Sequence, residues 1–309
     1  MDDSREGQDA GAAAVLRPAD AIPLGSALIS HVAEQAGIRA LVIKGLVVEQ
    51  LGLRRPRQYA DIDVLVEPAR FDDLVRELGA RGWHERVHFW MFDHIDEHSM
   101  TLIHPSWPVD IDLHRHFPGF LAPKAAVFDE LWQNRAEFTI AGRPVLGTDE
   151  PASAAVLALH ALRWMHTARN VTEYAYLIEQ LRERPETGRA LAELAARTGS
   201  SETLRSVLDE LGIAPVAGRP VSSRALKAWR RRISHPSRTG QWFTYLQSLP
   251  VSRWPRELRA VVWPPAELFL QEHSSVPNTP RALFAGRVRR LRKGMLGLPR
   301  VIAAGFRKG

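Results

Sequence analysis

Residues 43–68, IKGLVVEQLGLRRPRQYADIDVLVEP, place two carboxylates in a run that otherwise has the composition of a buried strand. Side chains at positions i and i+2 of a strand lie on one face of its sheet. Asp61 and Asp63 therefore project together, and Leu65 continues their face. The opposite face takes three apolar side chains: Ile62, Val64 and Val66. The alternation predicts a strand with one fully apolar face and one face that begins with two carboxylates.

A later stretch, PVDIDLHRHF at residues 108–117, has the same alternation. Asp110, Asp112 and His114 share one face of the expected strand, and Ile111 and Leu113 take the other. If this strand and the first are neighbours, three or four carboxylates converge. Converging carboxylates resist joint ionisation unless a cation lies between them.

Oxygen ligands in a chain without cysteine suit a hard divalent ion, Mg²⁺ or Mn²⁺. Such a site clamps a nucleoside triphosphate and activates a hydroxyl for in-line attack on phosphorus. The alternative is that the aspartates lie at solvated strand ends, which is the commoner outcome for an isolated D-x-D.

Two features before the D-x-D favour the metal site. Lys44 and Gly45 lie between an expected strand and an expected helix, where glycine lets the backbone approach phosphate oxygens and a helix N-terminus offers free N–H groups. Lys44 adds a positive charge. Arg57 precedes Asp61 by four residues, close enough to contact a phosphate. The ordered set of K-G, R-x-x-x-D-x-D and a third carboxylate on a later strand is more specific than any of its parts.

With these motifs in place, the chain resembles the nucleotidyltransferases of the polymerase-beta superfamily. More narrowly, it resembles an uncharacterised bacterial branch that is often linked to lasso-peptide and other natural-product gene clusters. The resemblance covers residues 22–135, and LALHALRWMH at residues 157–166 extends it more loosely.

The resemblance implies a role for each matching residue. Asp61 and Asp63 match the paired metal ligands. Asp112 matches the third carboxylate, which helps to bind metal and deprotonates the acceptor hydroxyl. Lys44 and Gly45 match the segment that holds the triphosphate. The implied cofactors are two Mg²⁺ (or Mn²⁺) ions, with a nucleoside triphosphate as co-substrate.

Other positions are less clearly assigned by the resemblance. Arg57 matches an arginine upstream of the D-x-D. Lys44-Gly45 replaces the common Gly-Ser pair, and Ala60 replaces the usual serine or glycine before the D-x-D, which leaves the donor nucleotide open. Asp110 has no assured counterpart: it either substitutes for Asp112 or is an exposed neighbour.

Four further side chains are candidates for contact with substrate. His114 lies on the Asp112 face, where it either orients an acceptor or carboxylate directly or supports the site by a hydrogen bond. His160, Arg163 and His166 recur at about helical spacing, so they either line a cleft against the first domain or form a solvated helix face.

The chain has 309 residues, enough for two domains of ordinary size. The pattern and the resemblance imply an α+β fold, in which a polymerase-beta-like domain with a mixed sheet flanked by helices precedes an all-helical C-terminal domain. We expect a disordered leader at 1–20, a nucleotidyltransferase domain at 21–148, a helical substrate-binding domain at 149–272 and a basic tail at 273–309. The expected helices after residue 148 are 150–168, 171–183, 187–198, 201–212, 222–233 and 240–248.

The net charge of +6 is concentrated at the C-terminus. Residues 281–309 hold nine of the 41 basic residues and no acidic one, which leaves 32 basic against 35 acidic residues in the rest. This weakens any argument that the whole fold binds nucleic acid, although the tail could contact it. The acidic, polar N-terminus lacks the features of a signal peptide, and no run of about 18 apolar residues occurs, so we expect a cytoplasmic protein without a membrane span.

These features favour an enzyme that moves a nucleoside monophosphate, in the first place AMP from ATP, to a hydroxyl or phosphate of a small molecule or modified peptide and releases pyrophosphate. Two alternatives stay open. One is a nucleotidyltransferase that modifies RNA ends or acts as a toxin, guided by the basic tail. The other is a non-catalytic accessory protein that retains the fold.

Overall fold

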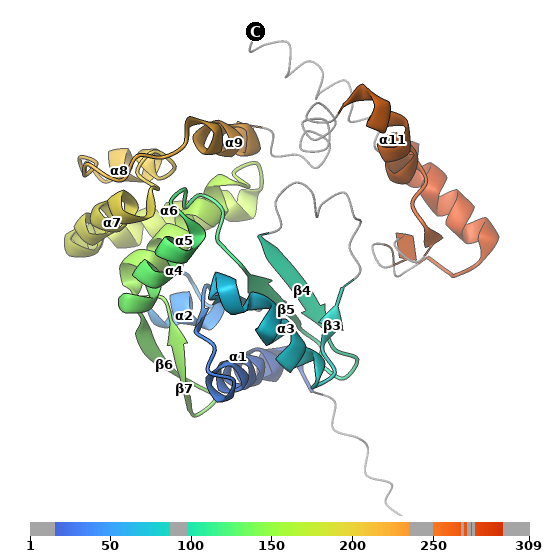
Figure 1. Cartoon of the computed structure of the whole chain (residues 1–309), viewed down its shortest axis with the longest axis horizontal. Helices are drawn as coiled ribbons and strands as arrows, with labels where there is room; N and C mark the ends of the chain where they lie inside the picture. Colours follow the sequence, from blue (N-terminus) through green and yellow to red (C-terminus); the bar gives the residue numbers. More distant parts are fainter. Residues whose placement is uncertain are drawn as a thin grey trace, which may run out of the picture.

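The computed structural model describes residues 16–86, 98–234, 250–266, 269–270, 273 and 276–292, and its strands form one mixed sheet. The order across the sheet is β3-β4-β5-β2-β1-β7-β6 (Figure 1). The strands are β1 Ala40–Val42, β2 Asp61–Val66, β3 His84–Glu85, β4 Ser99–Ile103, β5 Asp110–His114, β6 Ala136–Ile140 and β7 Arg143–Gly147. Residues 83–92 also have a strand-like sequence, but residues 87–92 lie outside the described residues. The helices that flank this sheet and follow it confirm the expected α+β class.

The central pair of the sheet is β2 with β5, which run parallel in a register that aligns their polar residues. Asp61 is opposite Asp110, Asp63 is opposite Asp112, and Leu65 is opposite His114. Paired residues of neighbouring strands point to the same face. The two D-x-D strands are therefore neighbours, which was the condition for their carboxylates to converge.

Apolar side chains cover the two faces of the sheet in separate clusters. On one face, strand residues pack with α1 (Pro18–Gln35) and α3 (Phe71–Gly79), the latter preceded by a 3₁₀ turn at Pro68–Arg70. This cluster contains the strand residues predicted for the apolar face: Ile62, Val64, Val66, Ile111 and Leu113. Leu65 belongs to the other cluster. The carboxylates consequently project from the face of the sheet opposite to α1.

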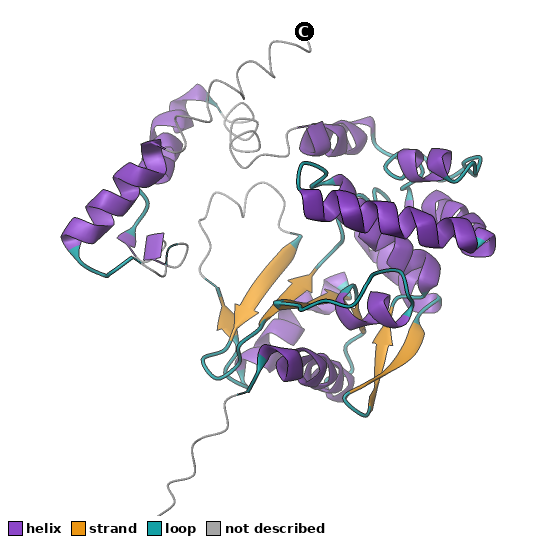
Figure 2. Ribbon diagram, turned by 180° about the vertical axis from the view of Figure 1, so that it is seen from behind, coloured by secondary structure: helices purple, strands orange, loops and turns teal. Residues whose placement is uncertain are grey.

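That second face is covered by α2 (Gly45–Gln50), α4 (Lys124–Gln133) and the helices that follow the sheet. Figures 1 and 2 show α1 on one side of the sheet and α5, α6 and α7 on the other. The cluster runs without interruption from Leu41 and Leu65 in the strands to Leu208 and Trp229 in the late helices. The helical part thus shares an apolar core with the sheet.

The described elements that follow β7 are all helical, as expected. They are α5 Glu150–Leu162, α6 Ala168–Glu183, α7 Pro185–Thr198, α8 Arg205–Glu210, α9 Ser223–Ser234, a 3₁₀ turn Val251–Arg253 and α11 Trp254–Val262, and residues 280–292 are also helical. Asp149 caps α5 by accepting a hydrogen bond from the Ala152 amide at 3.0 Å. The expected helix at 240–248 and tail residues 293–309 lie outside the described residues, as does the leader up to residue 15. Because α1 begins at Pro18, three residues expected in the leader are helical.

The expectation of one helix over 150–168 is wrong, because α5 ends at Leu162. A turn over residues 163–167 follows, in which Thr167 begins α6 by accepting a hydrogen bond from the Asn170 amide at 3.3 Å. The Thr167 hydroxyl also donates to the Trp164 carbonyl at 3.1 Å. His160 and Arg163 therefore lie at the end of one helix, while His166 lies in the turn.

Strands β6 and β7 form a hairpin with a two-residue turn at Ala141-Gly142, since Ile140 pairs with Arg143. Both turn residues have positive φ, 51° for Ala141 and 70° for Gly142. Two-residue hairpin turns with both φ values positive favour Asn-Gly, and an alanine there is strained.

We expect Ala141→Asn to raise the free energy of unfolding by about 0.5–1 kcal/mol, because asparagine adopts positive φ at lower cost. Urea denaturation checks this. Gly142→Ala is the matched control: a Cβ there meets nothing within 4 Å, so its expected destabilisation reports the backbone alone. Equal stability of Ala141→Asn and the wild type would contradict the turn assignment.

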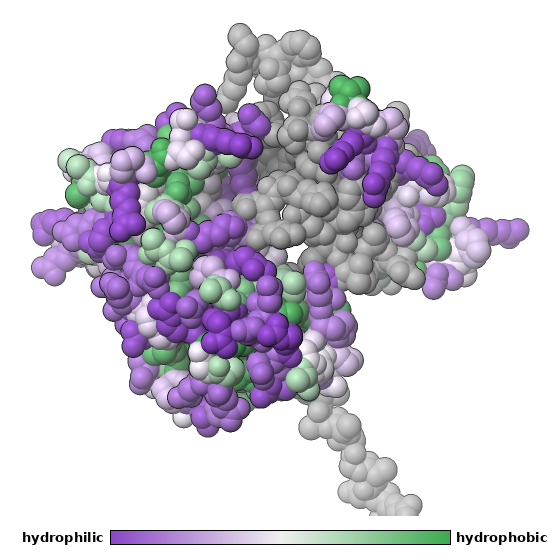
Figure 3. Space-filling model, in the orientation of Figure 1, coloured by the Kyte–Doolittle hydropathy of each residue, from purple (hydrophilic) through white to green (hydrophobic). Residues whose placement is uncertain are grey.

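On the face shown in Figure 3, the part of the molecule that contains the sheet is mainly hydrophilic, with apolar side chains in small groups. Among the described helices, none combines the length and the apolar character needed to cross a membrane.

Candidate active site

Three side chains from β2 and β5 converge on the face of the sheet opposite to α1. Among the described residues, Asp63, Asp112 and His114 each offer one ligand atom, and these atoms lie within 4.8 Å of one another. His114 Nε2 lies 2.9 Å from Asp63 Oδ1 and 3.3 Å from Asp112 Oδ2. The Thr101 hydroxyl donates to Asp112 Oδ1 at 3.2 Å and fixes that carboxylate. Two carboxylates and an imidazole at this separation are a chemically suitable donor set for a divalent cation.

Lys44, which follows β1, contacts the carboxylate of Asp63. Its ammonium forms an ion pair with Asp63 Oδ1, and it lies 5.8 Å from the centre of the Phe117 ring. The backbone of Lys44 has φ 65° and ψ −154°, a conformation that residues other than glycine rarely adopt. Gly45 follows with φ 52°. The strained turn thus directs a buried ammonium at Asp63.

Burial and neighbouring charges move the pKa values of Asp61 and Asp63 in opposite directions. Burial raises the pKa of the Asp63 carboxyl, but Lys44 and His114 lower it by more, so its net pKa lies well below the ordinary value. Burial, followed by repulsion from Asp63, raises the pKa of Asp61 to about 6. Asp61 stays outside the set of Asp63, Asp112 and His114 but within electrostatic range of it. The charged form of Asp61 is thus disfavoured at this site, and either a proton or a bound cation would relieve its repulsion from Asp63.

The raised pKa of Asp61 gives the free energy of unfolding a specific pH dependence. Asp61 binds its proton more tightly in the folded state, so its stabilising effect is complete below pH 3.8 and is lost as the pH rises through about 6. In a chelator at pH 7.5, we expect Asp61→Asn to raise the free energy of unfolding by about 1 kcal/mol, a value reduced because the Asp61 side chain is only partly buried and solvent screens its charge.

Denaturant unfolding between pH 3.5 and 8 measures the effect, with Asp209→Asn on α8 as an exposed control. The gain should shrink below pH 6 and vanish near pH 4. A gain that is independent of pH would show that Asp61 is not repelled by its neighbours.

Asp110 belongs to a different interaction. Arg86 Nη2 donates to both of its carboxylate oxygens, at 2.7 Å and 2.6 Å. The side chain that lies beside Asp63 is instead Asp112, in register on the next strand. Of the two carboxylates that the sequence left open, Asp112 is therefore the one that the structure brings to the cluster.

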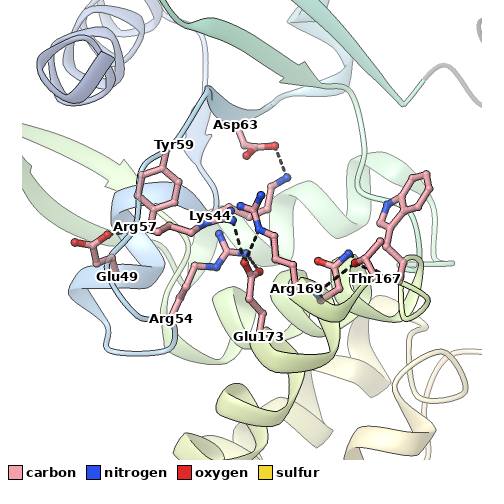
Figure 4. A network of polar contacts seen from close by, with 11 residues as sticks. Lys44, Glu49, Arg54, Arg57, Tyr59, Asp63, Thr167, Arg169 and Glu173 are labelled. Carbon is pink, nitrogen blue, oxygen red and sulfur yellow. Dashed lines mark hydrogen bonds and ion pairs between the residues drawn. The ribbon is translucent and has the colours of Figure 1, made fainter. Parts of the chain in front are cut away.

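Arginines from two parts of the chain lie beside this site. Figure 4 shows Arg54, Arg57 and Arg169 converging on Glu173 of α6, while Lys44 reaches Asp63. Arg54 Nη2 lies 2.9 Å from Glu173 Oε2, and Arg57 Nη1 lies 2.9 Å from Glu173 Oε1. Arg57, the candidate for phosphate contact, is consequently held by a carboxylate of the helical part.

The structure separates the three candidates at the end of α5. Arg163 is buried, with its guanidinium 5.0 Å from the centre of the same Phe117 ring that Lys44 approaches. Burial, followed by Lys44 and Arg163, lowers the pKa of His160 well below its ordinary value, so this imidazole is neutral beside the site. His166 is exposed, and its ring lies 5.8 Å from that of Trp164. The structure brings His160 and Arg163 to the site, but it places His166 at the surface.

Sequence reasoning gave no role to several side chains at the site. Thr101 lies on β4, and only the antiparallel pairing of β4 with β5 aligns it with Asp112. Arg54 was one of three arginines within four residues, and nothing in that run distinguished it. His114 was placed on the Asp112 face from the sequence but was not named as a metal ligand, although its position two residues after Asp112 was a signal for that role.

Comparison with known proteins gives a family match. A family model described as uncharacterised nucleotidyltransferase matches residues 26–209, more than half of the chain. No curated protein matches the sequence.

Several solved structures show weaker likenesses. One is the antibiotic-resistance factor ANT(2'')-Ia, with 16% identity and a TM-score of 0.41 over 62% of this chain and 99% of that one. Another is the lincosamide antibiotic adenylyltransferase LnuA bound to lincomycin, with 17% identity and a TM-score of 0.35 over 50% of this chain and 94% of that one. A third is an antigenic nucleotidyltransferase-like protein from Paracoccidioides brasiliensis, with 13% identity and a TM-score of 0.37 over 65% and 95% of the two chains.

Proposed function

The chain belongs to a family of uncharacterised nucleotidyltransferases, and on that premise we propose that it transfers AMP from ATP to a hydroxyl or phosphate of an acceptor and releases pyrophosphate. The observation that carries the proposal is the parallel register that pairs Asp63 with Asp112 beside Lys44. This register joins a D-x-D to a third carboxylate, as the reaction requires.

The residues present fit a divalent ion, Mg²⁺ or Mn²⁺. Asp63, Asp112 and His114 would hold it, with Asp61 close by to hold a second ion. When bound, such an ion neutralises the carboxylates and acts as a Lewis acid on phosphoryl oxygens. His114 Nε2 lies against Asp63 and Asp112, whereas Nδ1 is buried and makes no hydrogen bond to any described residue, so Nε2 is the ring nitrogen positioned to act as a ligand.

The remaining steps are assigned to side chains of the site. Asp112, oriented by Thr101, accepts the proton of the acceptor hydroxyl while the oxygen of that hydroxyl forms a bond to the α-phosphorus of ATP. The bond from that phosphorus to the bridging oxygen breaks, and pyrophosphate leaves with its electron pair. Lys44, Gly45 and Arg57 hold the triphosphate. Because α2 has only six residues, this contact is assigned to the Lys44 ammonium and the Gly45 backbone and not to a helix dipole.

The acceptor is proposed to be a small molecule or a modified peptide of a natural-product pathway. The support for this class is the resemblance to a branch linked to lasso-peptide and other natural-product gene clusters. The end of α5 brings His160 and Arg163 near Lys44 and Asp63, and we assign the choice of acceptor to this helical part.

Labelled nucleotides test the reaction. The protein is incubated with ATP labelled at the α-phosphate, with Mg²⁺ or Mn²⁺ and with candidate acceptors. We expect label on the acceptor and an equal amount of pyrophosphate, and neither with the Asp61→Asn, Asp63→Asn double variant. Transfer of label from the γ-phosphate instead would identify a kinase and overturn the proposed reaction.

A further inference from the structure

The carboxylate of Glu173 contacts three arginines that come from two segments of the chain. Arg54 and Arg57 lie in the segment between α2 and β2, at 2.9 Å each, and Arg169 Nε lies one helical turn before Glu173, at 3.1 Å. Three guanidinium groups on one carboxylate leave a formal excess of two positive charges. A cluster of this kind is complementary to an anion with several charges.

The arginines keep donors that Glu173 does not use. Arg54 is only 5% exposed, and its Nε atom and that of Arg57 are buried without a hydrogen bond to any residue that the structure describes. Buried guanidinium donors without partners are costly and are normally paired. Glu173 alone therefore neutralises this cluster incompletely.

The cluster lies next to the candidate active site. The pKa of His160 is lowered first by burial, and the charges of Lys44, Arg163, Asp63 and Arg54 also act on it. Arg54 therefore lies within electrostatic range of the residues around Asp63. Figure 4 shows Lys44 between Asp63 on one side and the arginines with Glu173 on the other. A polyanion with one end at Asp63 could thus extend into the arginine cluster.

We propose that Arg54, Arg57 and Arg169 bind the terminal phosphates of the nucleotide, and hence pyrophosphate, and that the Glu173 carboxylate is an internal anion that occupies this site until those phosphates displace it. Carboxylate and phosphate oxygens make the same paired contacts with guanidinium groups. The exchange replaces one negative charge by several and gives the unused Nε donors acceptors. This inference rests on the proposed function for the identity of the anion as a nucleotide.

Displacement of Glu173 has a consequence for the segment that carries the arginines. That segment is attached to α6 by other contacts: the Tyr176 hydroxyl donates to the Gly52 carbonyl at 3.4 Å, and the Arg55 guanidinium lies 5.0 Å from the centre of the Tyr176 ring. The arginines therefore stay in place when Glu173 withdraws, and the anion finds a preformed site.

Binding of inorganic tripolyphosphate to the full chain, measured by calorimetry in a chelator, tests the inference without metal or turnover. If Glu173 competes with the anion, Glu173→Gln should bind tripolyphosphate about tenfold more tightly than the wild type. Glu179→Gln, an exposed position on the same helix, should bind like the wild type. Unchanged or weaker binding by folded Glu173→Gln would overturn the inference, because a carboxylate that only positions the arginines would lower affinity when removed.

A second pair of variants serves if Glu173→Gln does not fold. Arg169 has a side chain that is 63% exposed, so its replacement spares the core. Arg169→Gln should weaken tripolyphosphate binding about fivefold, and Arg182→Gln, exposed on the same helix, should not. Equal binding by these two variants would also overturn the inference. A protein that binds tripolyphosphate as expected but transfers no nucleotide would refute the proposed function alone, and normal transfer with no effect of Glu173 would refute this inference alone.

Discussion

Asp112→Asn is expected to lower the rate of nucleotidyl transfer by about a thousandfold, whereas Asp110→Asn is expected to lower it by less than about tenfold. Both aspartates lie on β5 and share a face of the sheet, two residues apart. Asp112 faces Asp63 and His114, so it can bind a cation and accept a proton. Asp110 is bound by Arg86 through both carboxylate oxygens. An amide at position 112 can still accept the Thr101 hydrogen bond, so the loss should be chemical and not structural.

Transfer from α-labelled ATP and thermal unfolding of both variants provide the test. We expect Asp112→Asn to unfold within a few degrees of the wild type, while its turnover falls. Asp110→Asn leaves Arg86 without its carboxylate, so its main effect should be on stability. Comparable losses of turnover in the two variants would mean that the third carboxylate is not specified by this register, and the proposed active site would have to be redrawn.

The part of the site formed by β2 and β5 could be predicted from sequence because it depends on a local rule. The two-residue period of a strand fixes which face Asp61 and Asp63 share, and it does so again for Asp112 and His114. The pairing of the two strands was a hypothesis, and the structure confirms it with Asp63 opposite Asp112. One local period applied twice therefore accounts for most of the carboxylate cluster.

The contacts that depend on tertiary structure could not be predicted. Arg54 and Glu173 are separated by 119 residues, and no periodicity relates them. The pairing of Arg86 with Asp110 depends on β3 and β4 continuing the sheet beyond β5. The end of α5 was also missed, because apolar spacing continues through residues 163–167 while a hydrogen-bonded cap at Thr167 starts a new helix. In each case a side-chain contact, and not the apolar pattern, decides the structure.

Lys44→Met is expected to separate two roles of this side chain, because the loss should affect metal and nucleotide in opposite directions. The ammonium of Lys44 neutralises buried Asp63 when no cation is bound. Its removal should tighten the binding of Mn²⁺ about tenfold, since the metal no longer competes with a fixed positive charge. The same change should lower transfer from ATP about a hundredfold, since a positive charge on the triphosphate is lost.

Stability distinguishes this account from simple damage to the fold. Methionine keeps most of the apolar stem and meets the same positive φ, so the backbone strain at position 44 cancels in the comparison. In a chelator, Lys44→Met should lose about 3 kcal/mol of stability, because Asp63 is left buried without its ammonium. Saturating Mn²⁺ should restore more stability to the variant than it adds to the wild type.

Titration with Mn²⁺, followed by thermal unfolding with and without the ion, measures both effects, and Lys124→Met on α4 is the control for loss of an exposed lysine. Weaker Mn²⁺ binding by Lys44→Met would contradict competition at Asp63. Tighter Mn²⁺ binding with unchanged transfer would mean that Lys44 acts only in the metal-free protein, where it neutralises Asp63, and that the arginines alone bind the triphosphate. Tighter binding with reduced transfer is the result expected if one ammonium serves the carboxylate before the nucleotide binds and the phosphates afterwards.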